Sequence, residues 1–232
     1  MKTLSFDAHS LKKVPILKGL HDSDYTRIFS LGKIKHFQKN ISLFNQGDEA
    51  AAVLIILEGK IKISQIGEDG NQVLLRVLGP GQLLAGVAVL ENGTYPATGN
   101  TLEKTTLFCL DKTALLLLMS QYPPIALSII QLLLKRIEEL QKRFREIATE
   151  RVEIRIARTL LHFASQHGIK KPEGILIDFP LTRQDLAEFT GTTLFSVSRL
   201  LKTWEREEIL ESGRKKVTLL QVEKLKSILK ED

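Results

Sequence analysis

The chain has 232 residues, 43% of them hydrophobic and 26% charged, which is the composition of a folded globular protein and excludes a disordered or fibrous one. The longest apolar runs are too short to cross a bilayer and the first residues lack the apolar core of a secretory signal, so we expect a cytoplasmic chain with no membrane partner. A formal net charge of +6 permits a nucleic-acid partner, but the charge is spread over both halves of the chain and does not require one.

In chain order, short helices are expected over residues 1–32, where His21 to Asp24 have the form of a helix start. Residues 33–112 change to short β-rich runs that are broken by glycines. Short strands at this spacing predict a barrel or a sandwich. The three clearest predicted strands cover residues 53–57, 60–64 and 72–77.

A single cysteine, Cys109, limits the redox and metal chemistry of the chain. One thiol cannot form an internal disulfide or supply the several ligands of an iron–sulfur cluster. Its neighbours Leu107, Phe108 and Leu110 predict the interior of a strand. We interpret Cys109 as a structural thiol, because free cysteine is among the most buried residue types.

A long helix is predicted after Pro123 and Pro124, because apolar residues recur there at alternating spacings of three and four. This is the seam of a two-stranded coiled coil, which predicts that two copies of the chain pair along the helix. A helix that lies on its own β-rich domain is the other interpretation, and one helix can serve both purposes. The predicted dimer seam consists of Ile130, Leu133, Ile137, Leu140, Phe144 and Ile147.

Residues 150–232 are predicted to form a second unit that ends in a helix pair and a β-turn-β segment. Thr182 and Asp185 form a capping box that starts the first helix of the pair, and Gly191 supplies the turn that ends it. The small Ala187 lets the second helix approach, and Val197 packs it against the first. This spacing is typical of a helix-turn-helix.

The second helix of the pair has an apolar stripe that contains Val197 and an opposite face that suits a polyanion. On that face Arg199 is predicted to read a guanine in the major groove, with Ser198 on a base edge or phosphate. Basic residues at the tip of the β-turn, and polar residues around the helix pair, suit the phosphate backbone. The predicted DNA-binding residues are Thr182, Arg183, Gln184, Thr192, Thr193, Phe195, Ser198, Arg199, Lys202, Arg214, Lys215 and Lys216.

Phe195 does not match a surface that meets a polyanion, and two interpretations of it stay open. Its ring can pack on a thymine methyl group, which is an apolar contact that the major groove permits. Alternatively, it folds back against its own domain near Leu194 and contributes only packing.

These features together resemble the Crp/Fnr superfamily of bacterial transcription regulators over nearly the whole chain. The resemblance rests on the long helix and on residues 44–48, 57–63, 78–82, 181–187 and 191–199. In this superfamily the position of Phe195 often carries a glutamate, so the resemblance implies a different preferred base at the position that Phe195 faces.

The resemblance implies an α+β fold in three parts. Residues 1–120 would form N-terminal helices and a jelly-roll-like β-roll that senses an effector, residues 121–149 a dimerisation helix and hinge, and residues 150–232 a winged helix-turn-helix. It also implies a homodimer that binds a palindromic double-stranded DNA operator, with RNA polymerase as a further partner if the protein is an activator. The effector would shift the seam, and a hinge near residues 148–150 would reorient the winged helices.

The effector site departs from that of relatives that bind cyclic AMP. Those relatives carry a glutamate for the ribose and an arginine for the phosphate, where this chain has Gly86 and Tyr95 or Pro96. No Lys or Arg occurs between Gly81 and Gly99, and burying a phosphate without a cationic partner is costly. We therefore expect neither cyclic AMP nor an iron–sulfur cluster.

What remains is a predicted apolar pocket for an effector that the sequence does not identify. It would take an uncharged or aromatic ligand, haem, or nothing. Residues 192–199 with Trp204 and Glu205 are similar to the nitric-oxide and denitrification branch, which implies haem-based sensing as one alternative, although all five histidines are expected at surface or packing positions. The predicted lining consists of Leu83, Leu84, Gly86, Val87, Val89, Leu90, Tyr95, Ile137, Leu140, Gln141 and Phe144.

Two other classes of protein fit the sequence less well. No metal-ligand cluster, phosphate-binding glycine loop or Ser/His/Asp arrangement is found, so we predict that the protein is not an enzyme and holds no metal site. A cyclic-nucleotide-binding regulatory module without DNA function is the alternative, and the complete helix-turn-helix with its basic turn argues against it.

Overall fold

The structure is a computed structural model that describes residues 6–67, 70, 72–91 and 93–230. It divides the chain into two compact units with their border between Ile137 and Glu138. The border lies inside the predicted dimerisation helix, whereas the sequence placed divisions after residues 120 and 149.

The N-terminal unit opens with the predicted short helices, which are η1 (Ala8–Lys13), η2 (Pro15–Leu17) and α1 (Asp22–Leu31). Helix α1 begins where the sequence placed a helix start. The Asp24 carboxylate there accepts a hydrogen bond from the His21 backbone N–H at 3.0 Å, which satisfies one of the free donors of the first turn.

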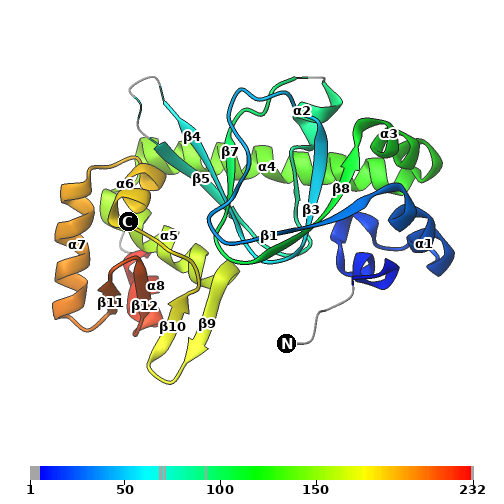
Figure 1. The fold of residues 1–232 in the computed structure, drawn as a ribbon. Helices are drawn as coiled ribbons and strands as arrows, with labels where there is room; N and C mark the ends of the chain where they lie inside the picture. The colour runs from blue at the N-terminus through cyan, green and yellow to red at the C-terminus, as the bar shows by residue number, and fades with distance from the viewer. Residues whose placement is uncertain (1–5, 68–69, 71, 92, 231–232) are drawn as a thin grey trace. The chain divides into compact units, whose positions relative to one another are not determined.

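Two four-stranded sheets follow and confirm the predicted β-roll (Figure 1). One has the strand order β1-β8-β3-β6 and the other β2-β7-β4-β5, and all paired strands run antiparallel. Apart from the β4–β5 hairpin, strands that are neighbours in a sheet are not consecutive in the chain, as in a jelly roll. The strands are β1 (Lys33–Phe37), β2 (Ser42–Phe44), β3 (Ala52–Glu58), β4 (Ile61–Ile66), β5 (Gln72–Leu78), β6 (Leu83–Leu84), β7 (Thr98–Thr101) and β8 (Thr105–Asp111).

Strands β3 and β8 are buried on both faces, which explains their continuous apolar sequences. Val53 and Ile55 pack with the helices in what we call the helix-side cluster. Leu54 and Ile56 alternate with them and pack between the two sheets, in what we call the inter-sheet cluster. Cys109 of β8 belongs to the inter-sheet cluster and is 7% exposed, which confirms that it lies inside a strand.

Three helices complete the N-terminal unit and lead out of it: α2 (Gly86–Leu90), α3 (Lys112–Gln121) and α4 (Pro123–Thr149). Helix α4 confirms the predicted long helix. Helix α3 was not predicted, because four consecutive leucines in its centre hide any helical period.

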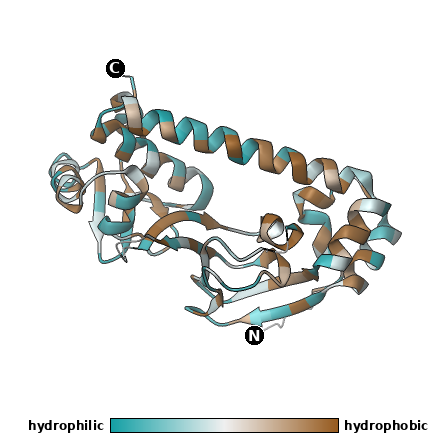
Figure 2. Ribbon diagram, turned by 90° about the horizontal axis from the view of Figure 1, so that it is seen from above, coloured by the Kyte–Doolittle hydropathy of each residue, from teal (hydrophilic) through white to brown (hydrophobic). Residues whose placement is uncertain are grey.

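Apolar residues recur along α4 (Figure 2), and several of the large ones are exposed. Leu133 departs from the predicted seam, because it is half-buried and packs against the helix-side cluster of its own unit. Leu134, one residue later, is 54% exposed and lies on the open face instead. The exposed large apolar residues of α4 are Leu127, Ile130, Leu134, Ile137, Leu140, Phe144 and Ile147.

The C-terminal unit contains a helical core and one small antiparallel sheet of order β11-β12-β10-β9 (Figure 1). Strand β9 and helix α8 were not predicted. All four residues of β9 are exposed, so no alternation marked it as a strand. The elements are α5 (Val152–His167), β9 (Gly168–Lys171), β10 (Gly174–Ile177), α6 (Arg183–Thr190), α7 (Leu194–Arg206), β11 (Leu210–Gly213), β12 (Lys216–Leu219) and α8 (Val222–Ile228).

Within the described residues, no single helix has both the length and the apolar character needed to cross a membrane. Helices α3 and α4 meet that test only when taken together, across a bend of 111°.

Candidate nucleic-acid interface

Helices α6 and α7 form the predicted helix-turn-helix, and both of its sequence signals are confirmed. Thr182 Oγ1 accepts a hydrogen bond from the Asp185 backbone N–H at 2.9 Å, and the Asp185 carboxylate accepts one from the Thr182 N–H at 2.9 Å. Gly191 ends α6 with φ 61° and ψ 46°, the left-handed conformation that glycine adopts without strain. The hydroxyl of Thr182, which was predicted to contact DNA, is therefore already used as the cap of α6.

Helix α7 begins at Leu194, three residues after the turn glycine, because Thr193 caps it. The Thr193 hydroxyl accepts a hydrogen bond from the Ser196 backbone N–H at 3.1 Å. The backbone N–H of Thr192 donates to the Ala187 carbonyl at 2.9 Å and closes the turn. Both threonines thus hold the start of α7 in place.

Helix α7 buries one stripe and exposes the opposite one. Val197, Leu201 and Trp204 are at most 1% exposed and anchor the helix in its domain. Arg199 and Lys202 are exposed on the other side, where they line a shallow hollow of about 640 Å³ with Glu205 and Arg206. Sequence reasoning missed Arg206, although its place seven residues after Arg199 puts it on the same face of the helix.

Phe195 lies in the first turn of α7 with its side chain in solvent. It is 74% exposed, and its neighbour Leu194 is 48% exposed. A ring folded back against its own domain would be buried, so the packing interpretation of Phe195 is wrong. The start of α7 therefore presents an apolar pair beside the cationic Arg199.

Arg183 was predicted to contact phosphate, and the structure places it in an internal contact. Its Nη2 donates to Ser212 Oγ at 3.1 Å and lies 3.7 Å from the Glu205 carboxylate. The Ser212 hydroxyl in turn donates to the same carboxylate. The first turn of α6, the last turn of α7 and strand β11 are joined by this triad of side chains.

The β11–β12 hairpin forms the predicted basic wing. Arg214, Lys215 and Lys216 are all exposed at its tip, and Lys215 takes a positive φ of 62° to make the turn. The Lys215 carbonyl accepts a hydrogen bond from the Leu181 N–H at 3.2 Å, which ties the tip to the chain entering α6. Three cations are thus held beside the helix-turn-helix in the same unit.

The predicted effector-pocket residues of the N-terminal unit do not line a single cavity, because they are divided between the two clusters. Leu84 and Tyr95 belong to the inter-sheet cluster, whereas Leu83 and Val89 belong to the helix-side cluster. Val87 is 43% exposed. Among the remaining predicted residues, Gly86 is buried, Leu90 packs on the helix-side cluster, Ile137 is exposed, and Leu140, Gln141 and Phe144 belong to the C-terminal unit.

The described members of the inter-sheet cluster are apolar apart from the Tyr95 hydroxyl and the Cys109 thiol. The rings of Phe44 and Tyr95 stack with their centroids 4.2 Å apart. The Tyr95 hydroxyl lies 3.2 Å from the Ala51 backbone N–H, from which it accepts a hydrogen bond. Cys109 is the sulfur of this cluster, and burial raises the pKa of its thiol. The interior offers a ligand mainly aromatic and aliphatic contacts.

One cation that the sequence did not indicate lies near the predicted pocket. Arg136 of α4 donates from Nη2 to the Leu83 carbonyl at 2.7 Å. It is separated from Leu83 by more than fifty positions in the chain, so no local motif indicates the contact. The guanidinium fastens α4 to strand β6.

No cluster of three or more His, Cys, Asp or Glu side chains suited to a metal ion occurs in the part of the chain that the structure describes. His36 is exposed, and its Nδ1 lies 3.1 Å from Thr106 Oγ1. His9 and His21 are exposed as well, and His162 and His167 belong to the C-terminal unit.

Two family models match the two units. Residues 34–122 match the cyclic nucleotide-binding domain, and residues 154–228 match the Crp-like helix-turn-helix domain.

Known proteins match over most of the chain. A probable transcriptional regulator, flp, of Lacticaseibacillus casei is 27% identical over 93% of this chain and 96% of its own. The cyclic AMP receptor protein of Thermus thermophilus is 26% identical over 88% and 91%. The solved structure of the c-di-GMP responsive global regulator CLP of Xanthomonas campestris shares the fold, with a TM-score of 0.74 at 21% identity over 86% of this chain and 99% of that one.

Proposed function

The chain belongs to the Crp/Fnr family of transcriptional regulators, and we propose from this premise that it acts as a homodimer that reads a palindromic DNA operator with helix α7. It is an effector-responsive DNA-binding regulator. The rival interpretation, a cyclic-nucleotide-binding module without DNA function, does not account for the helix-turn-helix match over residues 154–228.

The proposal of how DNA is read rests on the exposed face of α7. Arg199 and Lys202 are exposed there, and neither forms an ion pair with any residue that the structure describes. Arg199 would donate two hydrogen bonds to a guanine, since this is the commonest specific contact in the major groove. Lys202, Arg206 and the three cations of the wing would hold the phosphate backbone and set the register.

Two variants of the full chain test this assignment. Replacing Arg199 with alanine is expected to cost about 1–3 kcal/mol of binding free energy and to relax discrimination at one base pair. Replacing Lys202 with alanine should weaken binding evenly across sequences and lower the salt slope by about one. If Arg199→Ala leaves sequence discrimination intact, Arg199 is not the base reader.

The exposed apolar face of α4 supports the homodimer. Seven large apolar residues of one helix face solvent, which is the kind of continuous patch that a second copy covers. A two-fold dimer places two copies of α7 about 34 Å apart, one turn of DNA, and so selects inverted half-sites. The compartment would be the cytoplasm, and RNA polymerase would be a further partner if the protein activates transcription.

An uncharged, apolar effector fits the N-terminal unit better than cyclic AMP. The inter-sheet cluster is lined by aliphatic and aromatic side chains, and the chain has no Lys or Arg between Gly81 and Gly99. A phosphate between the sheets would lose its hydration without a cation to replace it. Arg136 is the cation that lies near this site, where its Nη2 donates to the Leu83 carbonyl at 2.7 Å.

Haem fits these residues poorly. His9, His21 and His36 of the N-terminal unit are all exposed, and burial raises the pKa of the Cys109 thiol, which disfavours the thiolate that would bind iron. Haem-based nitric-oxide sensing would need another axial ligand. The absorbance spectrum of the full chain, produced with haem supplied, tests this: we expect no Soret band, and a Soret band at one haem per chain would overturn the apolar-effector proposal.

A further inference from the structure

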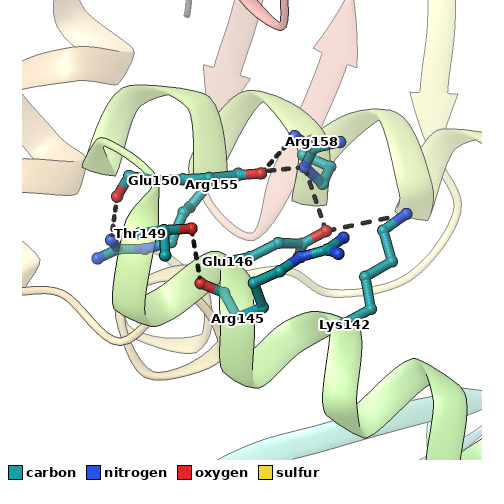
Figure 3. A network of polar contacts seen from close by, with 7 residues as sticks. All are labelled: Lys142, Arg145, Glu146, Thr149, Glu150, Arg155 and Arg158. Atoms are coloured by element: carbon teal, nitrogen blue, oxygen red, sulfur yellow. Dashed lines mark hydrogen bonds and ion pairs between the residues drawn. The ribbon is translucent and has the colours of Figure 1, made fainter.

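The joint between α4 and α5 is closed by a network of polar contacts (Figure 3). Arg158 of α5 lies 3.3 Å from the Glu146 carboxylate and 2.7 Å from that of Glu150. Lys142 approaches the same Glu146 carboxylate at 3.8 Å. Glu150, in the segment expected to act as a hinge (residues 148–150), is therefore tied to α5 by an ion pair.

Arg155 reaches from this joint to the helix-turn-helix. Its Nη1 donates to the carbonyls of Glu150 at 2.7 Å and Ile147 at 3.4 Å, at the end of α4. Its Nε donates to the Thr190 carbonyl at 2.9 Å and its Nη2 to the Gly191 carbonyl at 3.2 Å, at the end of α6. The last carbonyls of a helix have no partner within the helix and carry its negative dipole end. One guanidinium thus caps two helices.

Two further contacts join the same elements. Arg143 of α4 donates to the Phe189 carbonyl at 2.5 Å, and its guanidinium lies 3.8 Å from the centroid of the Phe189 ring. Ile147, which was predicted in the dimer seam, packs over Gly191, where an added Cβ would lie 3.5 Å from its Cγ2. The last turns of α4 and the α6–α7 turn are therefore joined by several side-chain contacts.

We infer that Arg155 is a positioning residue for DNA recognition, which makes the helix-turn-helix follow every rotation of α4. The inference rests on the proposed function as a dimeric DNA reader. Helix α4 contains the border between the two units, so a change in the N-terminal unit reaches α7 through it. In a dimer joined along α4, Arg155 would fix the separation of the two recognition helices.

The planar guanidinium is the group that this position requires. It presents donors from three nitrogen atoms in a fixed fork, so it reaches the ends of two helices at once. A lysine ammonium keeps the charge but donates from one atom. The partners of Arg155 are backbone carbonyls, which no substitution at their own positions removes, so Arg155 itself is the residue to change.

The spacing between half-sites gives the test. The full chain first selects an operator from random duplex DNA, and its affinity is then measured for that operator, for one with the half-sites moved apart by about half a helical turn, and for a single half-site. We expect the unaltered chain to bind the selected operator about 100-fold more tightly than the operator with altered spacing. For Arg155→Met this ratio should fall to about 10-fold or less. The affinities of the two proteins for a single half-site should agree within about threefold. Arg155→Lys should lie between the two.

The matched control is Arg151→Met, which changes an exposed arginine at the start of the same helix, and it should keep the full spacing preference. Hydrogen exchange should quicken together in residues 145–150 and 188–193 of Arg155→Met and remain unchanged elsewhere. A folded Arg155→Met that keeps the full preference overturns the inference, as does an equal loss of affinity for operator and half-site. If the unaltered chain enriches no DNA, the proposed function itself fails, before any variant is compared.

Discussion

Arg183 at the start of α6 and Glu205 near the end of α7 lie 3.7 Å apart and share Ser212 of strand β11 as a common partner. This contact joins the three elements that a winged helix-turn-helix brings to DNA. Both charged side chains are partly exposed, at 35% and 29%, so the ion pair adds little to stability by itself. Its value lies in fixing the angle between the wing and the recognition helix.

Replacing Glu205 with alanine should weaken DNA binding severalfold, although it removes a negative charge from a surface that meets phosphate. The reason is that Arg183 and Ser212 lose their common acceptor and the wing is no longer fixed. Fluorescence anisotropy with the selected operator measures the change. Glu207→Ala removes the same charge from an exposed position just after the end of α7, two residues beyond Glu205, and should bind at least as tightly as the unaltered protein. Equal affinities of the two variants would rule out a positioning role for Glu205.

Phe195 should recognise a thymine through its methyl group. Replacing that thymine with deoxyuracil removes one methyl, and we expect the unaltered protein to lose about 0.8 kcal/mol, or about fourfold in affinity. Phe195→Ala should bind the two DNAs equally, because the ring that contacts the methyl is gone. If deoxyuracil costs both proteins the same at every thymine of the half-site, Phe195 does not read a methyl group.

The exposed face of α4 should hold the dimer together. Leu134→Glu places a charge on that face, and a two-fold interface brings it opposite its own copy, so we expect the dimer dissociation constant to rise by about 100-fold or more. Lys135→Gln changes the net charge by the same amount on another face of the helix and should leave the dimer intact. Sedimentation equilibrium measures both, and a Leu134→Glu chain that remains dimeric would place the interface elsewhere.

The Cys109 thiol should react slowly in the folded protein. Burial raises its pKa, so the folded chain holds the neutral thiol at neutral pH and releases the proton at a higher pH than an unfolded chain does. The thiol therefore favours the folded state at neutral pH, and that contribution is lost as the pH rises from the unfolded pKa through the folded one. Alkylation should be much faster in denaturant than in native buffer at pH near 8. Equal rates would show that Cys109 is open to solvent.

Local signals in the sequence predicted the parts of this fold that depend on neighbours in the chain. Thr182 and Asp185 cap a helix across three positions, and Gly191 is the residue that its turn requires. Whether a residue of a long helix is buried depends on which distant segments cover that side of the helix. Spacing alone therefore could not show that Leu133 is half-buried and Leu134 exposed.

Contacts between distant segments could not be predicted from the sequence. Arg155 forms its bonds with backbone carbonyls, which any residue type supplies, and no pattern marks them. The division of Leu83 and Leu84 between two clusters follows from the opposite directions of successive strand residues, which becomes visible only when both faces of the sheet are known to be covered. The exposure of Phe195 likewise depends on the packing around α7.

Two copies of α7 should read the two halves of one palindrome. Selection from random duplex DNA by the full chain, followed by sequencing of the bound fraction, measures this. We predict enrichment of two inverted half-sites with their centres about one helical turn (~34 Å) apart, lost in a parallel selection with Arg199→Ala. No enrichment, or a single half-site without an inverted partner, would show that the two copies of α7 do not read a palindrome.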